Sequence, residues 1–218
     1  MDSVYTENET PFIHPFSCII AGSSQSGKTV FATKLIKHLD EMISPKISRV
    51  IVSYTEDQSA YQEMCSLDSR VNLIKGRDFD FIPGENTLII IDDQMDTALG
   101  DKSIQNLFTK GVHHRSVSVI LITQDLYPQE KCARTIRRNS TYLVVFRSPT
   151  FQLQVQCLGR QLYPHYKGYI QSAYTTATMK PYTYIFLNLH PTCHEDIRIR
   201  SGILPFEDLI VYVPAQHY

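Results

Sequence analysis

The segment from Cys18 to Thr29 runs from a short apolar stretch into the sequence GSSQSGKT. Residues 22–29 match G-x-x-x-x-G-K-[ST] at every fixed position. Apolar residues then recur at helical spacing, at Val30, Phe31, Leu35, Ile36 and Leu39. A strand, a glycine-rich turn and an amphipathic helix, in this order, are what a phosphate-binding loop requires. The pattern therefore predicts a site for a nucleoside triphosphate.

Each part of this loop has an expected role. Gly22 and Gly27 let the backbone turn tightly, so that successive N–H groups and a helix N-terminus surround the phosphates. Lys28 is expected to reach the outer phosphates, and Thr29 to ligate Mg²⁺. The residues expected to bind the nucleotide are Gly22, Ser23, Ser24, Gln25, Ser26, Gly27, Lys28 and Thr29.

Length and composition favour one folded domain. The chain has 218 residues, of which 43% are hydrophobic and 20% charged, so it can bury a sizeable core. We expect a flexible lead-in over residues 1–15, its end pinned to the sheet through Phe12, Pro15 and Phe16, and a single P-loop domain over residues 16–218. The net charge of −1 excludes a generally basic protein that coats nucleic acid, so any DNA contact needs a local patch.

The chain lacks the sequence signals of a membrane or secreted protein. It has no run of about 18 apolar residues, and its first ten residues are acidic and polar. We therefore expect a soluble, intracellular protein without membrane contact. The five cysteines are scattered, with no CxxC pair, which favours reduced thiols in the core over a disulfide framework.

Continuously apolar runs recur along the chain. We expect strands over residues 16–21, 49–54, 87–91, 117–123 and 142–147. Runs of this kind, separated by helices, are typical of an α/β fold with a mostly parallel central sheet and helices on both faces. Shorter strands are expected over residues 181–189, 196–200 and 209–213, with little helix between them. These predict a short antiparallel C-terminal extension at one sheet edge.

Two carboxylates end the apolar run at residues 87–91. This is the form of a Walker B element, in which Asp92 would hold the Mg²⁺ shell and Asp93 would orient the attacking water. The alternative is a pair of solvated strand-end caps. Because the strand at 49–54 comes between the two motifs, we assign the additional-strand (ASCE, RecA-like) type of P-loop NTPase, which hydrolyses ATP to do mechanical work. No Asn-Lys-x-Asp element for guanine is present.

A further apolar strand, at 117–123, ends in an amide. Gln124 would sense the γ-phosphate by hydrogen bonding to water and to phosphoryl oxygens, unless it is a simple strand-end cap. Nine residues earlier, Arg115 lies in the segment His113-His114-Arg115. It is the leading candidate for an arginine finger supplied to a neighbouring subunit, the alternative being a solvated surface arginine.

Two other clusters leave alternatives open. The basic segment 131–138 would place Arg134, Arg137 and Arg138 on one helix face, where they would contact DNA phosphates, a neighbour's nucleotide or only water. The second cluster, His190, Cys193 and His194, has no clear fourth metal ligand, so a turn between edge strands is favoured over zinc.

Several of these motifs together resemble one family. The segments His14-Pro15-Phe16, GSSQSGKT, IIIDD, HHRSVSVILITQ and DLIVYVP are similar to genome-packaging ATPases of the FtsK/HerA superfamily, of the poxvirus and Polinton/adintovirus kind. The resemblance extends over residues 12–214. At Asp93 many superfamily members have Glu, although viral packaging members often share the Asp. At His113 cellular relatives have the arginine.

The resemblance implies a homo-oligomeric ring, a pentamer or hexamer, around double-stranded DNA. ATP would be hydrolysed between neighbours to push viral DNA into a preformed capsid, with a capsid or portal-vertex protein as partner, in a virus-infected cell. Carried over, Asp92 binds the metal, Asp93 the water and Gln124 the γ-phosphate. Three alternatives remain: a small-molecule or nucleoside kinase, a cellular or plasmid DNA-pumping ATPase, and a nucleotide-dependent scaffold protein.

Overall fold

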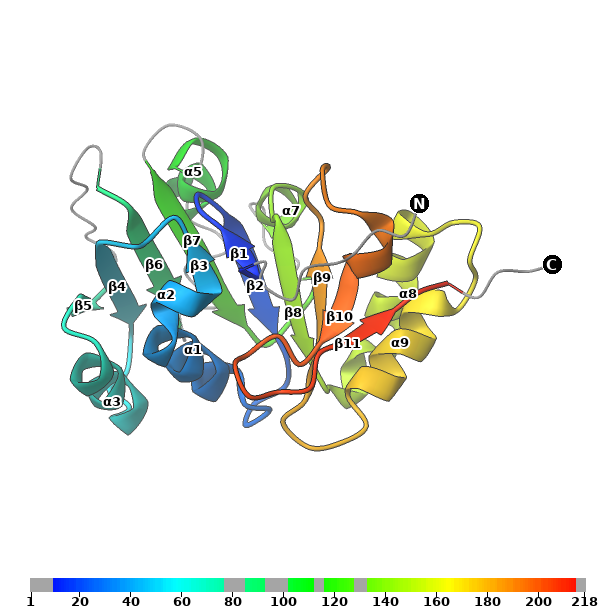
Figure 1. The fold of residues 1–218 in the computed structure, drawn as a ribbon, viewed down its shortest axis with the longest axis horizontal. Coiled ribbons are helices and arrows are strands. Elements are labelled where there is room, and N and C mark those ends of the chain that lie inside the picture. The colour runs from blue at the N-terminus through cyan, green and yellow to red at the C-terminus, as the bar shows by residue number, and fades with distance from the viewer. Residues whose placement is uncertain (1–9, 77–84, 93–101, 112–115, 128–132, 215–218) are drawn as a thin grey trace.

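The computed structural model describes residues 10–76, 85–92, 102–111, 116–127 and 133–214. Within these residues, nine strands form one central sheet (Figure 1). They are β2 (Ser17–Ala21), β4 (Arg49–Tyr54), β5 (Val71–Lys75), β6 (Thr87–Ile91), β7 (Val117–Thr123), β8 (Tyr142–Phe146), β9 (Tyr184–Asn188), β10 (Ile199–Ser201) and β11 (Ile210–Tyr212). Their order across the sheet is β11-β10-β9-β8-β2-β7-β6-β4-β5.

The sheet has a parallel part and an antiparallel part. All pairs from β5 to β8 are parallel, whereas β8–β9, β9–β10 and β10–β11 are antiparallel. The predicted α/β fold, with its antiparallel C-terminal extension, is therefore confirmed. The central strands carry apolar side chains in unbroken runs because both faces of the sheet are covered.

Helices cover the two faces of the sheet and create two cores. On one face lie α1 (Lys28–Lys37), α2 (Leu39–Met42) and α3 (Ser59–Leu67). On the other lie α5 (Lys102–Asn106), the π-helix η1 (Leu107–Gly111), α7 (Ala133–Arg138), α8 (Gln152–Leu162) and α9 (Tyr169–Ala177). Alternate strand residues feed the two cores, as Ile20 and Ile19 do in β2. The remaining described helices are two short 3₁₀-helices, η2 (Pro149–Phe151) and η3 (Glu195–Ile197). None of the described helices is long and apolar enough to cross a membrane.

The strand inserted between the two nucleotide-binding strands is β7. In the sheet, β7 pairs with β2 on one side and with β6 on the other. The strand at residues 49–54, β4, instead pairs with β6 on its outer side. The predicted type of fold is right, but the strand named for it is wrong, since neighbours along the chain are not always neighbours in the sheet.

The residues just before β2 belong to the folded domain. β1 (Phe12–Ile13) pairs in parallel with β3 (Ile43–Ser44). Phe12 is fully buried and stacks on Phe16 at a ring distance of 5.0 Å. Phe12 thus pins this segment to the core beside Phe16, as predicted, while the domain boundary at residue 16 stays a prediction. Residues 1–9 lie outside the described part of the chain, so the flexible lead-in stays a prediction for them.

Candidate active site

The loop at residues 22–27 has a shape that requires glycine at two positions. A Cβ at Gly22 would lie 2.6 Å from Ser26 Oγ and 2.7 Å from Phe146 Cβ, closer than such atoms approach in proteins. Gly27 caps α1 in the left-handed region, with φ of 104°. The Gly22 N–H donates to the Thr123 carbonyl over 3.2 Å, which ties the loop to the end of β7.

The N-terminus of α1 faces this loop and is open to an anion. No described side chain caps the helix, so its first N–H groups are left for a ligand. Ser26 Oγ is buried and has no hydrogen-bond partner among the described residues. A phosphate group would satisfy such donors, and the residues present therefore fit the predicted triphosphate.

The Lys28 amine lies across the same loop. Its Nζ donates to the Gly22 carbonyl over 2.9 Å and to the Ser23 carbonyl over 2.8 Å. The charge is thus held within the loop that would surround the phosphates. Ammonium–carbonyl hydrogen bonds can be exchanged for bonds to phosphate oxygens, which are stronger acceptors because they are charged.

The predicted metal ligands are in contact. Thr29 Oγ1 donates to Asp92 Oδ2 over 3.0 Å, although the two residues are 63 positions apart. Asp92 follows β6 directly and is only 5% exposed, and its N–H donates to the Ser53 carbonyl over 2.9 Å. A hydroxyl and a carboxylate are oxygen ligands of the kind that Mg²⁺ prefers. This donor pair fits the predicted ion, with Asp92 supplying the negative charge.

A cavity of about 260 Å³ opens between the loop and the ends of the parallel strands. Its lining combines the predicted residues with residues of β7: Ser24, Gln25, Lys28, Thr29, Gln58, Asp92, Ile122, Thr123 and Gln124. The structure therefore brings Gln124 into the same cavity as Lys28 and Asp92. Ligands of α/β sheets bind at this carboxyl edge.

Sequence reasoning missed Gln58. It precedes α3, in the segment that follows β4, and it lines the cavity. One feature of the sequence points to Gln58: it is a polar residue in the segment after an apolar strand, and such segments lie at the same sheet edge as Asp92.

Two of the predicted site residues, Asp93 and Arg115, are outside the described residues. The predicted helix with Arg134, Arg137 and Arg138 is found as α7, at the end of the sheet opposite the nucleotide loop (Figure 1).

One arginine of α7 is engaged within its own chain. The Arg137 guanidinium lies 4.4 Å from the centre of the Tyr127 ring and donates to Gln161 Oε1 over 3.1 Å. Burial raises the pKa of Tyr127 to about 12, so it remains a neutral ring under this cation at neutral pH. This arginine therefore has a structural partner of its own.

The cluster with His190, Cys193 and His194 forms a turn. Arg198 holds it by donating to the carbonyls of Asn188, His190 and Cys193 over 2.8, 3.2 and 3.0 Å. His190 Nδ1 contacts Thr192 Oγ1 at 2.7 Å. Among the described residues no group of three His, Cys, Asp or Glu side chains is placed to hold a metal ion.

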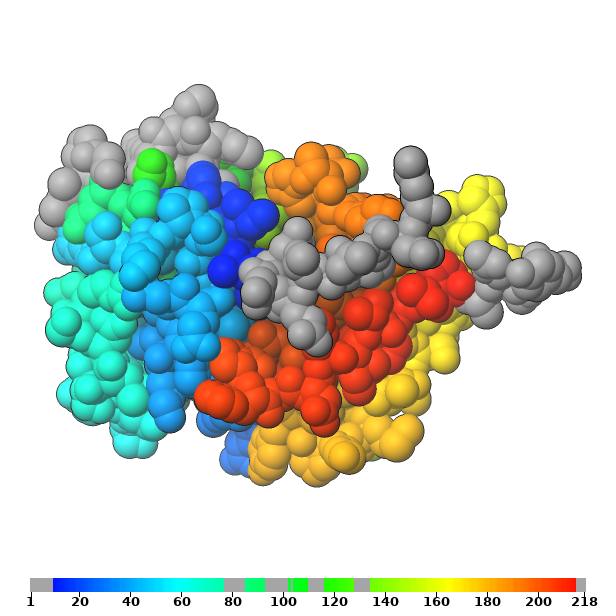
Figure 2. Space-filling view, in the orientation of Figure 1, coloured from blue at the N-terminus to red at the C-terminus, as the bar shows by residue number. Residues whose placement is uncertain are grey.

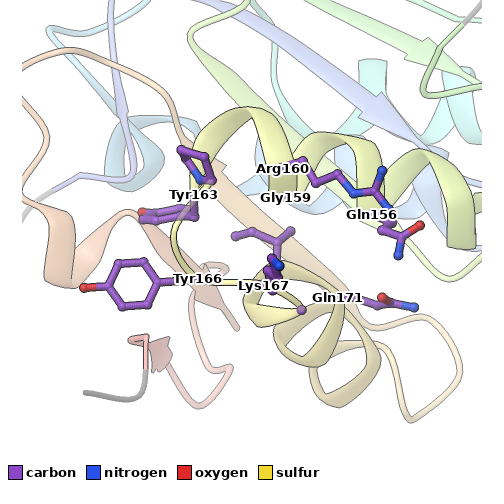
Figure 3. A pocket seen from close by; sticks show the side chains of 10 residues that line it. Gln156, Gly159, Arg160, Tyr163, Tyr166, Lys167 and Gln171 are labelled. Atoms are coloured by element: carbon purple, nitrogen blue, oxygen red, sulfur yellow. The ribbon is translucent and has the colours of Figure 1, made fainter. Parts of the chain in front are cut away.

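A larger cavity, of about 480 Å³, lies between α8 and α9 (Figure 3). Arg160, Tyr163 and Lys167 line it, and none of the predicted site residues does. The cavity at the nucleotide loop is smaller, but it alone of the two has a carboxylate, a lysine and an open helix N-terminus together. The smaller cavity is therefore the candidate site for the triphosphate and Mg²⁺.

No family model and no curated protein matches the chain, but solved structures do. The cytoplasmic domain of the Thermomonospora curvata type VII secretion ATPase EccC aligns with a TM-score of 0.53 and 12% identity, over 91% of this chain and 25% of that one. B204, the DNA-packaging ATPase of Sulfolobus turreted icosahedral virus, aligns with a TM-score of 0.51 and 14% identity, over 92% of this chain and 98% of that one.

A structure of B204 from Sulfolobus turreted icosahedral virus 2, in complex with AMPPCP, gives the same TM-score of 0.51, identity of 14% and coverage of 92% and 98%. The chain therefore shares the fold of these P-loop ATPases. The resemblance to packaging ATPases that the motifs predicted is confirmed at the level of the fold.

Proposed function

We propose that this chain is an ATP-hydrolysing translocase of double-stranded DNA that packages viral genomes into preformed capsids. The observation that carries the proposal is the contact of Thr29 with Asp92 beside Lys28, at the carboxyl edge of the sheet. The fold shared with B204, a protein described as a DNA-packaging ATPase, supports the choice of DNA as substrate.

The described side chains suggest a division of roles. Lys28 would exchange its bonds to the Gly22 and Ser23 carbonyls for bonds to the outer phosphates. Thr29 and Asp92 would hold Mg²⁺, which when bound neutralises charge on the phosphate oxygens. Gln124 would hydrogen-bond the γ-phosphate and the attacking water from the end of β7. Asp93 is the residue that we propose as the group that orients this water.

The remaining machinery would come from a neighbouring subunit. We propose a pentameric or hexameric ring around duplex DNA, in which Arg115 of one subunit stabilises charge on the phosphoryl group bound to the next. A capsid or portal-vertex protein would be the docking partner, in a virus-infected cell. The arginines of α7 are the alternative finger.

The first test is ATP hydrolysis with and without duplex DNA. We expect DNA to raise turnover in the wild type, and Lys28→Ala to abolish hydrolysis because the outer phosphates lose their positive partner. Lys167→Ala, between α8 and α9 and away from the site, is the control and should behave as the wild type. Turnover that duplex DNA does not change, or phosphorylation of a nucleoside, would contradict the proposal.

The second test is subunit mixing. Lys28→Ala and Arg115→Ala should each be inactive, whereas mixed oligomers should recover part of the activity, because a site with an intact Lys28 can receive Arg115 from its neighbour. The measurement is ATPase activity across mixing ratios, with mixed oligomers confirmed by differently tagged subunits. No recovery at any ratio would remove Arg115 from the finger role.

A further inference from the structure

A second cavity that borders the nucleotide loop, of about 320 Å³, is lined at one point by Gly27. Its lining is mainly apolar and aromatic: Gly27, Val30, Phe31, Lys34, Phe146, Tyr182, Tyr184, Leu204 and Glu207. The loop thus borders two cavities of different chemistry. The one with Asp92 suits phosphates and metal, and the one with Tyr182 suits a flat apolar group.

Apolar surface is exposed in this second cavity. Val30 is 59% exposed, although its spacing matches that of the apolar residues of its helix, and Tyr182 is 71% exposed. Both residues lie within the lining, next to the residues that would hold phosphates. Large apolar side chains exposed together beside a binding loop mark a place that a ligand covers.

Tyr182 is held in an unusual backbone conformation. Its φ is 64°, a left-handed value that costs free energy for a residue with a large side chain. The ring lies against the loop, since a Cβ on Gly27 would be 3.4 Å from Tyr182 Cδ1. Tyr182 therefore lies beside the helix N-terminus in a strained backbone conformation, and strain of this kind is concentrated at functional sites.

A hydrogen-bonded unit places a carboxylate at the same cavity. Tyr184 is 3% exposed and donates to Glu207 Oε2 over 2.6 Å, while its oxygen accepts from the N–H groups of Ile203 and Leu204 over 3.0 and 3.3 Å. These bonds fix the segment between β10 and β11 next to the loop. In Figure 2, the surfaces of α1 with its preceding loop (blue) and of the segment before β9 (yellow-orange) lie at the lower edge, and the surface of the segment before β11 (red-orange) adjoins them from above.

We propose that this second cavity binds the base of the nucleotide, an inference that rests on the proposed ATPase function. A phosphate chain whose outer end lies at Thr29 and Asp92 has its inner end at the N-terminus of α1, on the side of Gly27 and Val30. The base then stacks on Tyr182, and Glu207 accepts a hydrogen bond from an amino group at the edge of the base. Adenine has such a group, whereas uracil has a carbonyl at the corresponding position.

The test compares two ligands that share the phosphates but not the base. Binding of the non-hydrolysable ATP analogue AMPPCP and of inorganic tripolyphosphate, each with Mg²⁺, is measured by titration calorimetry on the full chain. Tyr182→Ala should weaken AMPPCP about 10-fold, the effect of losing one stacked base, and should leave tripolyphosphate unchanged. Tyr166→Ala, which removes an exposed tyrosine near α8 and α9, is the control and should change neither.

A second variant tests the carboxylate. Glu207→Gln keeps an oxygen that can accept from Tyr184 but removes the negative charge. It should weaken the methylene analogue of ATP by about 10-fold, the contribution of a hydrogen bond to a charged group, and should not weaken that of UTP. A wild-type protein with equal affinity for the two analogues would argue against base recognition by Glu207.

The outcomes separate this inference from the proposed function. Unchanged AMPPCP affinity in Tyr182→Ala overturns the base subsite, and so does an equal loss for both ligands, since Tyr182 would then act through the loop. In either case the ATPase proposal stands if the wild type binds and hydrolyses ATP. A wild type that binds neither ligand refutes the proposed function, and the base subsite with it.

Discussion

Replacing Gly22 by alanine should disable the nucleotide loop by steric overlap. The added Cβ would lie 2.6 Å from Ser26 Oγ and 2.7 Å from Phe146 Cβ, well inside ordinary contact. Ser26 has a short side chain that can rotate, but Phe146 Cβ belongs to the backbone-anchored part of a residue that is only 1% exposed. The loop must therefore shift away from β8, and its 3.2 Å bond to the Thr123 carbonyl lengthens.

Overlap of this kind costs about 1–3 kcal/mol in the free energy of unfolding. For a chain of this size that corresponds to a fall in Tm of about 2–12 °C. Because the loop moves as a whole, affinity for ATP should fall by more than 10-fold, as a loss of more than about 1.4 kcal/mol. Thermal unfolding followed by circular dichroism and calorimetric titration with AMPPCP would measure the two effects.

The matched control is Gly76→Ala. Gly76, unlike Gly22, has a positive φ, of 99°, and a Cβ there meets nothing within 4 Å. This variant should lose a similar 1–3 kcal/mol of stability through backbone strain alone and keep its affinity for ATP. If Gly22→Ala retains both the Tm and the affinity of the wild type, the steric reasoning about this loop is refuted.

Two further predictions concern carboxylates. Asp92→Asn should weaken Mg²⁺-dependent ATP binding at least about 10-fold, because the charged ligand beside Thr29 is lost, while Mg²⁺-free binding stays the same; equal binding at all Mg²⁺ concentrations would contradict the metal role. Hydrogen bonds from Arg70 hold the pKa of Asp68 and of Asp40 below the usual range. The two carboxylates therefore stabilise the folded protein fully at any pH above their unfolded pKa, which is near 4. This stabilisation is lost as the pH falls through their lower pKa values in the folded protein. Arg70→Met should therefore be less stable than the wild type by about 1–3 kcal/mol at pH 7. Between pH 6 and 3 the variant should lose less stability than the wild type, as measured by urea titrations. If stability depends on pH equally in both proteins, the Arg70 network is not the cause of that dependence.

The strands of the parallel sheet were predictable because burial on both faces leaves them as unbroken apolar runs. β4, β6 and β7 are found with the predicted bounds. β5 was missed, since an edge strand with Asn72 and Lys75 among its residues does not have that pattern. The order of the strands was not predictable, because it depends on which helices cross which face, and the sequence does not encode this locally.

The candidate site was predictable where its residues are consecutive. The loop at 22–29 and the acid that follows β6 both form continuous motifs, and the contact of Thr29 with Asp92 confirms their proximity. Gln58 and Tyr182 lie outside any motif, and only the packing of their segments against the loop brings them there. Val30 recurs at the spacing of the buried residues of α1, yet it lines the second cavity.

The residue before Gln124 is hydrogen-bonded to the first residue of the nucleotide loop. Ala21 and Thr123 are register partners in β2 and β7, and the Gly22 N–H donates to the Thr123 carbonyl just beyond that pair. A shift of Gln124 when the γ-phosphate leaves would therefore act on the first residue of the loop through one backbone hydrogen bond. Since β7 lies between the loop strand and the strand that ends at Asp92, the same shift would reach both halves of the site. The position of β7 between β2 and β6 would therefore couple them.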